Sequence, residues 1–534
     1  FIRTAPLAKR ALEATRTGRT RILPERFEKT WEHWLTGIHD WNVSRQLWWG
    51  HRIPAWYCPD GHVTVTSDPA GPEGCAGCPR PGAQLRQDPD IFDTWFSAGL
   101  WPFSTLGWPD QTPDLATYYP TSVMETGYDI IFFWVARMMM LGLELTGQEP
   151  FHTVYLSGLI RDPAGQKMSK TKGNVVDPLG VIDEAGADAL RFALIHGATP
   201  GNDQRFGTAK LDNARNFANK LWNATRYVVG ARPATIDIGA ARRIPDVRLL
   251  GPAERWLLSR AAATTQAADE AMAGYGFGEV TRLLYDAIWS EYCDWGLEFA
   301  KVRLGDATLT TEVREATWSA LVDVLDTYLR LLHPVMPFVT EALWAAIPHR
   351  AGDPEWLIVA RWPAAGERDL TVEAEVGTLV DLVTEIRNAR TTAKLPAGAW
   401  LESMVVVPPS LGPTFEALRP AIERLARVRP LHRELTTAAL AAATQPGDLT
   451  VIVDGGDVEA VVRPQGADTG ATALERERLE HDLAEADGWL AAARDRLANE
   501  SFTAKAPPAV VEGARQREAE LAEIVDRLRD RLEA

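Results

Sequence analysis

The sequence has few cysteines and lacks a long apolar run. Only four cysteines occur among 534 residues, which argues against a disulfide scaffold and favours the cytosol. The most apolar stretch, Asp129–Leu145, is shorter than the roughly 20 residues that a membrane helix needs. Arg137 lies in its middle. We therefore expect a buried helix here and no association with a membrane.

Two common catalytic signatures are also absent. No GxxxxGK[ST] phosphate-binding loop occurs, and no Ser-His-Asp or Cys-His arrangement indicates a nucleophilic side chain. The net charge of −16 argues against a general nucleic-acid coat but allows a local basic surface. A content of 46% apolar and 24% charged residues is typical of globular proteins, and the length predicts about three or four domains.

The first part of the chain has the pattern of parallel α/β structure. Between residues 41 and 198, short apolar strands alternate with helical patterns. Thr121–Gly127 predicts a strand ending in a glycine turn, Tyr128–Gly142 a helix, and Phe151–Leu156 the next strand. Asp177-Pro178 indicates the start of a further helix.

The remainder predicts three further regions. Residues 208–347 contain long helical patterns without strands, which indicates a bundle that the prolines after His333 and Met336 should interrupt. Residues 355–464 mix both patterns and end in a hairpin at Gly455-Gly456. From residue 471, two heptad seams predict an antiparallel coiled coil, although two ordinary surface helices remain possible. The seams comprise Leu479, Leu483, Ala486, Leu490, Ala493 and Leu497, then Val510, Ala514, Arg517, Leu521, Ile524 and Leu528.

A lysine-rich loop follows the strand at 151–156. Lys167, Lys170 and Lys172 lie among glycine, serine and threonine at 165–174. Lysine is a compact charge suited to phosphate oxygens, and the backbone N–H groups of such a turn suit them too. Two such lysines could neutralise charge that develops as pyrophosphate leaves an α-phosphate. By themselves these residues leave a solvated basic loop equally open.

Three of the cysteines have the spacing of a zinc site. Cys58 and His62 form Cys-x3-His, and Cys75 and Cys78 form Cys-x2-Cys within a Gly- and Pro-rich segment. This donor set completes a tetrahedral structural zinc site with no open position. A knuckle that has lost its metal, with reduced thiols, is the alternative. Cys293 falls in a helical pattern and indicates buried core.

Several stretches together resemble one enzyme family. KMSKT at 167–171 resembles the KMSKS signature of class I aminoacyl-tRNA synthetases. The other stretches that resemble valyl-tRNA synthetases are Trp41–Cys58, Gln87–Pro109, Glu125–Gly142, Leu331–Trp344 and Asn499–Glu512. The resemblance covers nearly the whole chain in order, and it reduces the solvated-loop interpretation to a minor one.

This resemblance implies a fold and an order of domains. The fold is an α/β, Rossmann-like catalytic half with a zinc-knuckle insertion, an α-helical anticodon-binding bundle, a small α/β unit and a coiled-coil arm. We expect a linker from the editing insertion at 1–40 and the catalytic half at 41–200, with its knuckle at 56–82 and its loop at 165–174. The bundle should follow at 201–350, the small unit at 351–470 and the tRNA-binding arm at 471–534.

The resemblance also implies site residues. Lys167 and Lys170 would act on the phosphates of ATP, which binds with Mg²⁺, as valine is converted to valyl-adenylate. ATP would also contact Gly127, Asp129, Met168 and Ser169, and Trp95 and Trp134 would wall the valine pocket. Asp129 could instead be only a helix N-cap, and either tryptophan could be plain core.

The implied partner is tRNA(Val), bound by a monomer in the cytoplasm. Candidate contacts are Arg205, Phe206, Arg215, Lys220 and Arg226 in the bundle, and Arg494, Arg496, Lys505 and Arg515 in the arm. Phe206 could stack a base, and the cations could reach phosphates.

One family signature is missing. The HIGH tetrapeptide occurs nowhere in these residues, so we expect the C-terminal part of a longer valine–tRNA ligase that cannot form valyl-adenylate alone. A non-catalytic tRNA-binding protein built from the same domains is the main alternative, and an isoleucine enzyme is a third possibility.

Overall fold

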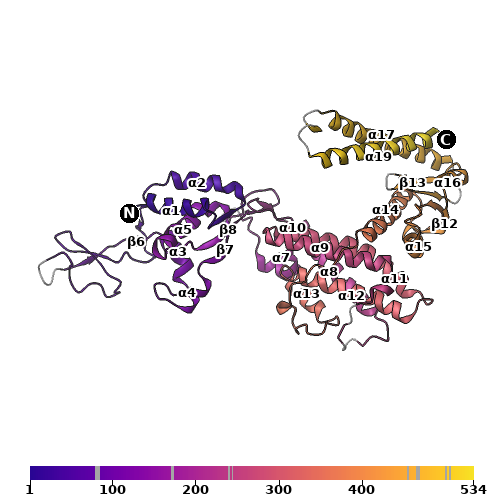
Figure 1. Cartoon of the computed structure of the whole chain (residues 1–534). Coiled ribbons are helices and arrows are strands. Elements are labelled where there is room, and N and C mark those ends of the chain that lie inside the picture. Colours follow the sequence, from indigo (N-terminus) through magenta and orange to yellow (C-terminus); the bar gives the residue numbers. More distant parts are fainter. Residues whose placement is uncertain are drawn as a thin grey trace. The chain divides into compact units, whose positions relative to one another are not determined.

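The chain divides into two compact units. A computed structural model describes the chain except residues 79–83, 170–172, 238–240, 243–244, 454–455, 465–468, 500–501, 504–506 and 534. Unit 1 comprises 1–177, 197–210 and 276–278, and unit 2 the rest (Figure 1). In the described part of the chain, no helix has the length and apolar character needed to cross a membrane.

A three-stranded parallel sheet is the centre of unit 1. Its order is β1 (Arg21–Leu23), β8 (Phe151–Ser157), β7 (Thr121–Gly127). Helix α5 (Ala136–Leu145) connects β7 to β8, as parallel neighbours require. The helix predicted at 128–142 begins instead with a 3-10 turn and a π-helical turn, η3 (Ile131–Val135), before α5 continues it.

The first 40 residues, expected as a linker, fold onto this sheet. They form α1 (Ala5–Arg16), β1, η1 (Glu25–Phe27) and α2 (Glu28–Thr36). Alanines at 8, 11 and 14 are buried, which lets α1 lie close to α5 in the core of the unit. Because β1 pairs with β8 along its whole length, this segment is part of the sheet.

Unit 1 also contains short elements outside the central sheet. A small sheet, ordered β4-β3-β5, carries the cysteine motif, β2 pairs with β6, and β9 pairs with β10 after the central sheet ends. Their bounds, with two accompanying helices, are β2 Ser44–Arg45, β3 Ala55–Tyr57, β4 Val63–Val65, β5 Arg86–Gln87, β6 Ile91–Phe92, α3 Thr94–Ser104, α4 Pro113–Tyr118, β9 Ile160–Arg161 and β10 Gln204–Arg205.

The first part of unit 2 is a helical bundle. Its core contains Trp318, Trp344, Tyr292 and Tyr328, all fully buried. Helix α12 ends at Leu332 and α13 begins at Pro337, so the two prolines interrupt the helix as predicted. The helices are α6 Pro178–Ala185, α7 Ala187–Ile195, α8 Thr208–Gly230, α9 Pro252–Ala273, α10 Phe277–Asp286, the π-helical η6 Ala287–Gly296, α11 Leu297–Gly305, α12 Thr311–Leu332 and α13 Pro337–Trp344.

The next part is a small α/β structure. Its sheet has the order β12-β11-β14-β13, with β11 parallel to β12 and the other pairs antiparallel. The predicted hairpin is β13 and β14, although Gly455 in its turn lies outside the described residues. The bounds are α14 Leu370–Thr392, β11 Leu401–Val406, α15 Gly412–Ala426, β12 Val428–Glu434, α16 Thr437–Ala443, β13 Leu449–Val453 and β14 Val458–Arg463.

The chain ends in two long helices, α17 (Thr469–Ala498) and α19 (Pro508–Glu533), which run antiparallel (Figure 1). Buried residues of both helices form one apolar cluster, including Leu490 and Leu521. The second predicted seam holds in part: Leu521 and Leu528 are buried and Ile524 packs against the cluster, whereas Val510 is 46% exposed. Among the described side chains of α19, Val511 and Val525 are also buried, and Leu521, Val525 and Leu528 lie on one face of the helix at helical spacing, whereas Arg517 is exposed.

Candidate nucleotide-binding loop and metal centre

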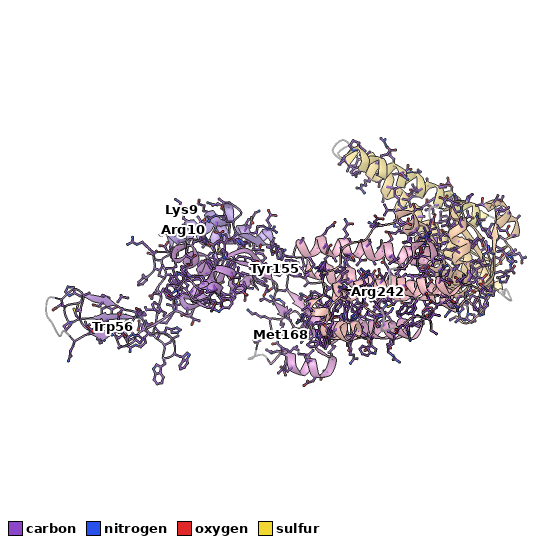
Figure 2. The ribbon with its side chains drawn as sticks, turned by 60° about the horizontal axis from the view of Figure 1, so that its bottom comes forward. Lys9, Arg10, Trp56, Tyr155, Met168 and Arg242 are labelled. Carbon is purple, nitrogen blue, oxygen red and sulfur yellow. The ribbon has the colours of Figure 1, made fainter. Side chains whose placement is uncertain are left out.

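The lysine loop leaves the sheet of unit 1 through β9. Arg161 and Lys167 form an antiparallel bridge, and between them Gly165 N donates to Asp162 O over 2.8 Å. Gly165 has a φ of +82°, which closes this tight turn without the steric cost that a side chain would incur. Lys167, half-buried Met168 (Figure 2) and Ser169 follow the turn. Lys170 and Lys172 lie outside the described residues.

Asn174 joins the two ends of this loop. Its Oδ1 accepts from Ser169 N over 2.9 Å, and its Nδ2 donates to Asp162 Oδ2 over 2.9 Å and to Lys167 O over 3.4 Å. An asparagine can both accept and donate in this way, whereas an aspartate could only accept. The residue was not among the predicted site residues. The sequence gives one indication of its role, which is its position directly after a glycine. In the structure this residue, Gly173, has a φ of +68°.

The predicted adenosine contacts lie where β7 ends. Lys167 Nζ is 3.5 Å from Asp129 Oδ2, and both side chains are solvent-accessible. A Cβ on Gly127 would lie 2.8 Å from Asp129 Oδ1, so glycine leaves room for that carboxylate. The structure thus brings three predicted residues together beyond the carboxyl end of a parallel strand, which is where such sheets bind ligands.

A second carboxylate, missed in the sequence, fixes the base of the loop. Asp203 Oδ1 accepts from Leu159 N over 2.9 Å, and Asp203 Oδ2 accepts from Arg161 Nε and Tyr128 OH. Desolvation raises the pKa of Asp203, but hydrogen bonds from Leu159, Arg161 and Tyr128 outweigh it, so the net shift is downward. The ionised carboxylate therefore ties the exits of β7 and β8 to the start of the loop.

The two predicted pocket tryptophans lie on adjacent elements but have different neighbours. Trp95, at the start of α3, stacks on Phe133 with a centroid distance of 5.9 Å. Trp134 Nε1 donates to Ala98 O over 3.4 Å, and its ring lies 6.3 Å from that of Trp101. A hollow of about 670 Å³ is lined by Trp134 but not by Trp95 among the described residues.

Two predicted tRNA contacts belong to unit 1. Arg205 lies on β10, with its Nε 3.4 Å from where a Cβ on Gly165 would be, so it covers the turn of the lysine loop. Phe206 is only 5% exposed and its N–H donates to Arg161 O. The expectation that Phe206 stacks a base is wrong, because a buried ring offers no free face.

The other predicted tRNA contacts remain exposed to different degrees. Arg215 and Arg226 are exposed on α8, and Arg215 pairs with Asp212 over 3.5 Å. Lys220 pairs with Asp294 over 2.6 Å and covers the Trp289 ring. In the arm, Arg494 pairs with Glu518 and Arg515 with Glu512, and Arg496 lies over the Phe502 ring. Lys505 lies outside the described residues.

The cysteine motif forms a compact cluster of metal-binding groups. One donor atom from each of Cys58, His62, Cys75 and Cys78 lies within 4.8 Å of the other three. His62 Nδ1 is 3.5 Å from Cys58 Sγ and 3.3 Å from Cys78 Sγ. The pKa of Cys78 is raised to about 12, because the sulfurs of Cys58 and Cys75 hold its proton by hydrogen bonds.

This donor set suits a tetrahedral ion. Sulfur and imidazole ligands at about 2.3 and 2.0 Å from zinc would be separated by distances of this size. Gly77 makes room for the histidine, since a Cβ there would lie 2.9 Å from the His62 ring. Trp56 is largely buried in the same segment (Figure 2), and a Cβ on Gly71 would lie 3.0 Å from its Nε1, so its ring packs against the Gly71 turn.

Three family models match the chain. The model of tRNA synthetases class I (I, L, M and V) matches 1–72 and 78–207, that of the anticodon-binding domain of tRNA ligase matches 254–405, and that of the valyl tRNA synthetase tRNA binding arm matches 472–534. The fold and the lysine loop are thus those of a class I tRNA synthetase.

Curated relatives narrow this class. Valine–tRNA ligases from Dehalococcoides mccartyi (strain CBDB1) and Brucella suis are 44% and 42% identical over 99% of this chain. The chain belongs to the valine–tRNA ligase family. It spans 58% and 56% of the length of these two relatives.

A solved structure supports the fold. Mycobacterium tuberculosis methionyl-tRNA synthetase in complex with methionyl-adenylate has a TM-score of 0.50 and 19% identity, over 64% of this chain and 61% of that one. At this identity the likeness concerns the fold alone.

Proposed function

We propose that this chain supplies the pyrophosphate-facing part of the site in which a valine–tRNA ligase forms valyl-adenylate. The single observation that carries this proposal is the position of Lys167, 3.5 Å from Asp129 at the end of β7, in a loop that Asn174 holds closed. The family membership of the chain supports the choice of valine and of tRNA(Val).

In the proposed reaction, a valine carboxylate oxygen attacks the α-phosphorus of Mg²⁺–ATP. A new P–O bond forms as the bond from the α-phosphorus to the bridging oxygen breaks, and pyrophosphate leaves with the electron pair. Lys167 and, from the sequence, Lys170 stabilise the negative charge that develops on the leaving group. Asp129 keeps the Lys167 ammonium near the strand end before the nucleotide enters. No nucleophilic side chain is needed, since the two substrates react directly.

The second proposed step transfers the valyl group to the 2′-hydroxyl of the terminal adenosine of tRNA(Val), with release of AMP. The bundle and the arm, an antiparallel coiled coil in this proposal, bind the tRNA. We expect the protein to act as a monomer in the cytosol, where the four cysteines, all free thiols, would stay reduced.

Valine-dependent exchange of pyrophosphate into ATP tests the proposal in the complete protein that contains these residues. Lys167→Ala should lower kcat about 100-fold, because a charge that acts mainly in the transition state is lost. Valine affinity should change by less than about threefold. Lys170→Ala should behave in the same way.

Lys9→Ala is the matched control, since Lys9 is an exposed lysine on α1 of the same unit (Figure 2). It should leave both constants unchanged. Equal losses of kcat and of valine affinity in Lys167→Ala would contradict the assigned role. If the complete protein bound tRNA(Val) but exchanged no pyrophosphate, the non-catalytic alternative would replace this proposal.

We also propose that Cys58, His62, Cys75 and Cys78 hold a structural zinc ion. With four protein ligands the ion would stabilise the knuckle and take no part in the reaction. The purified chain should contain about one equivalent of zinc by elemental analysis. His62→Ala should lose most of this metal, whereas His152→Ala, in an exposed position of β8, should retain it. Full retention of zinc by His62→Ala would exclude the histidine as a ligand.

A further inference from the structure

Unit 2 contains a strongly basic hollow whose lining, among the described residues, includes none of the predicted site residues. Its volume is about 700 Å³, and α11, α14, α15 and the start of β12 line it. Among its lining residues, one carboxylate faces five cations, which are Lys301, Arg387, Arg424, Arg427 and Arg429. This is a local excess of positive charge on a chain whose net charge is −16, and it is the arrangement that attracts a polyanion.

Three of these cations lack a compensating charge. Lys301 pairs with Glu298, and Arg429 Nε lies 3.1 Å from Glu423 Oε2. No carboxylate in the described part of the chain forms an ion pair with Arg387, Arg424 or Arg427. Like charges gathered in a hollow repel one another, and an anion that enters would relieve this repulsion.

Arg427 has a backbone conformation that would favour glycine. It ends α15 with a φ of +56°, in the left-handed region that costs an ordinary residue about 1 kcal/mol or more. A cation near a helix C-terminus is favourable, but a neighbouring position without this cost would provide the same interaction. The arginine at this position therefore indicates a use for its guanidinium, which points over Trp400 at 5.4 Å from the ring centroid.

A buried arginine holds the walls of the hollow. Arg390, 6% exposed, donates to the carbonyl oxygens of Ala426 and Arg427 over 3.2 and 2.8 Å. Its other nitrogen donates to Pro396 O and Ala399 O over 3.2 and 2.7 Å. One side chain thus fixes both the turn that carries Arg427 and the loop that leads to Trp400, so the hollow is formed before any ligand binds.

Four of the cations lie over aromatic rings, of which Trp400 lines the hollow itself. Arg427 and Arg429 both lie over Trp400, Arg387 lies over Trp295 and Lys301 lies over Tyr227. Guanidinium groups that lie over rings are restrained, so they lose less freedom on binding phosphate oxygens than mobile arginines do.

We propose that this hollow binds the phosphate backbone of RNA, and that the RNA is the tRNA of the proposed function, on which this inference rests. The contacts are to phosphates, so they contribute affinity and position but no base specificity. The family match at 254–405 includes Arg387 and Trp400, whereas Arg424, Arg427 and Arg429 come from the segment that follows it. The inferred surface therefore extends beyond the matched anticodon-binding domain into the small α/β structure.

The test compares two triple variants of the 534-residue chain that remove the same charge. The first is Arg387→Gln, Arg424→Gln, Arg427→Gln; the second, outside the hollow, is Arg248→Gln, Arg282→Gln, Arg419→Gln. Binding of a tRNA(Val) transcript is measured by fluorescence anisotropy at several salt concentrations. The hollow variant should bind at least about tenfold more weakly, and its slope of log affinity against log salt should fall by about 2 to 3, roughly 1 per lost phosphate contact. The second variant should bind like the unchanged chain.

Circular dichroism melts establish that both variants fold. If the hollow variant binds like the unchanged chain, or if both variants lose equal affinity, the inference is overturned while the proposed function stands. If the unchanged chain does not bind tRNA(Val), the proposed function fails and this inference with it. Polyglutamate is the second probe, and an equal loss of affinity for it would overturn the assignment to phosphate.

Discussion

Arginine has two opposite environments within unit 2. In the bundle (Figure 2), Arg242 is nearly inaccessible and its Nη2 lies 3.1 Å from Asp326 Oδ2 and 3.0 Å from Asp323 Oδ1. Arg330 contacts the same Asp326 and also Asp353 over 2.8 Å. In the basic hollow, Arg424 and Arg427 are exposed and have no such partners among the described residues.

The difference follows from how well water hydrates the guanidinium group in each of the two environments. A buried guanidinium has lost its water, so carboxylates must replace it or the fold is destabilised. A guanidinium at the edge of a hollow keeps part of its hydration and can exchange water for an external anion. Burial with partners therefore indicates a structural arginine, and accessibility without partners indicates one that binds a ligand. Substitutions at three positions test this distinction.

The largest effect on stability is expected from a substitution of Asp326. Asp326→Ala removes the carboxylate shared by Arg242 and Arg330 and leaves buried positive charge without full compensation. We expect the free energy of unfolding of unit 2 to fall by about 3 to 5 kcal/mol, measured by urea denaturation. Binding of tRNA(Val) by the folded protein should not change.

Asp246→Ala is the control, since in the described part of the chain Asp246 forms its ion pair with Arg248, whose side chain is 88% exposed. Exposed pairs contribute about 0 to 1 kcal/mol. If Asp326→Ala cost no more than this control, burial would not distinguish the two kinds of arginine.

A smaller, pH-dependent effect is expected at Glu373, which joins Arg368, Arg260 and Ser259. The hydrogen bond from Arg368 lowers the pKa of Glu373 most, desolvation opposes it, and Ser259 and Arg260 add to the lowering, to about 2 from 4.5. Because the pKa of Glu373 is lower in the folded than in the unfolded chain, its ionised carboxylate stabilises the fold above pH 4.5. This contribution is lost as the pH falls toward 2. Glu373→Gln should cost on the order of 2 kcal/mol at neutral pH.

Urea denaturation of both proteins across this acidic range measures the effect. The difference in unfolding free energy should shrink as the pH falls, because the unchanged protein then protonates Glu373 as well. Glu367→Gln, the neighbouring exposed glutamate, should show almost no difference at any pH. A difference that stayed constant with pH would mean that Glu373 contributes by packing and not by its charge.

Local patterns allowed much of the fold to be predicted. The strand at 121–127 is confirmed with its bounds, and the strand at 151–156 extends by one residue. Each has an apolar run bounded by turn residues, so its signal lies within a few neighbours. The lysine loop was recognisable because its residues are contiguous. The π-helical turn η3 at the start of the predicted helix could not be predicted, because its residues are as apolar as those of an α-helix at the same place.

Contacts between distant segments were not predictable in the same way. Asp203 accepts a hydrogen bond from Leu159 N, 44 residues away in the sequence. Arg390 donates one to Ala426 O, 36 residues away. Phe206 was assigned to RNA from its residue type, but its burial depends on how β10 packs. The basic hollow had a partial signal in the arginine-dense segment 419–433, yet only folding brings Arg387 and Lys301 to it.

The smallest effect is expected at Arg427 and separates stability from binding at one residue. Arg427→Ala loses the guanidinium but keeps a side chain at a φ of +56°, whereas Arg427→Gly loses both. Glycine should therefore be more stable than alanine by about 1 kcal/mol, measured by thermal unfolding. The two variants should lose affinity for tRNA(Val) equally, because each has lost the same charge.

If glycine were less stable than alanine, the backbone would not be strained at this position, and the reason to assign the arginine a binding role would be removed. If alanine bound RNA as well as arginine does, Arg427 would belong with the structural arginines, and accessibility alone would not identify a ligand-binding one.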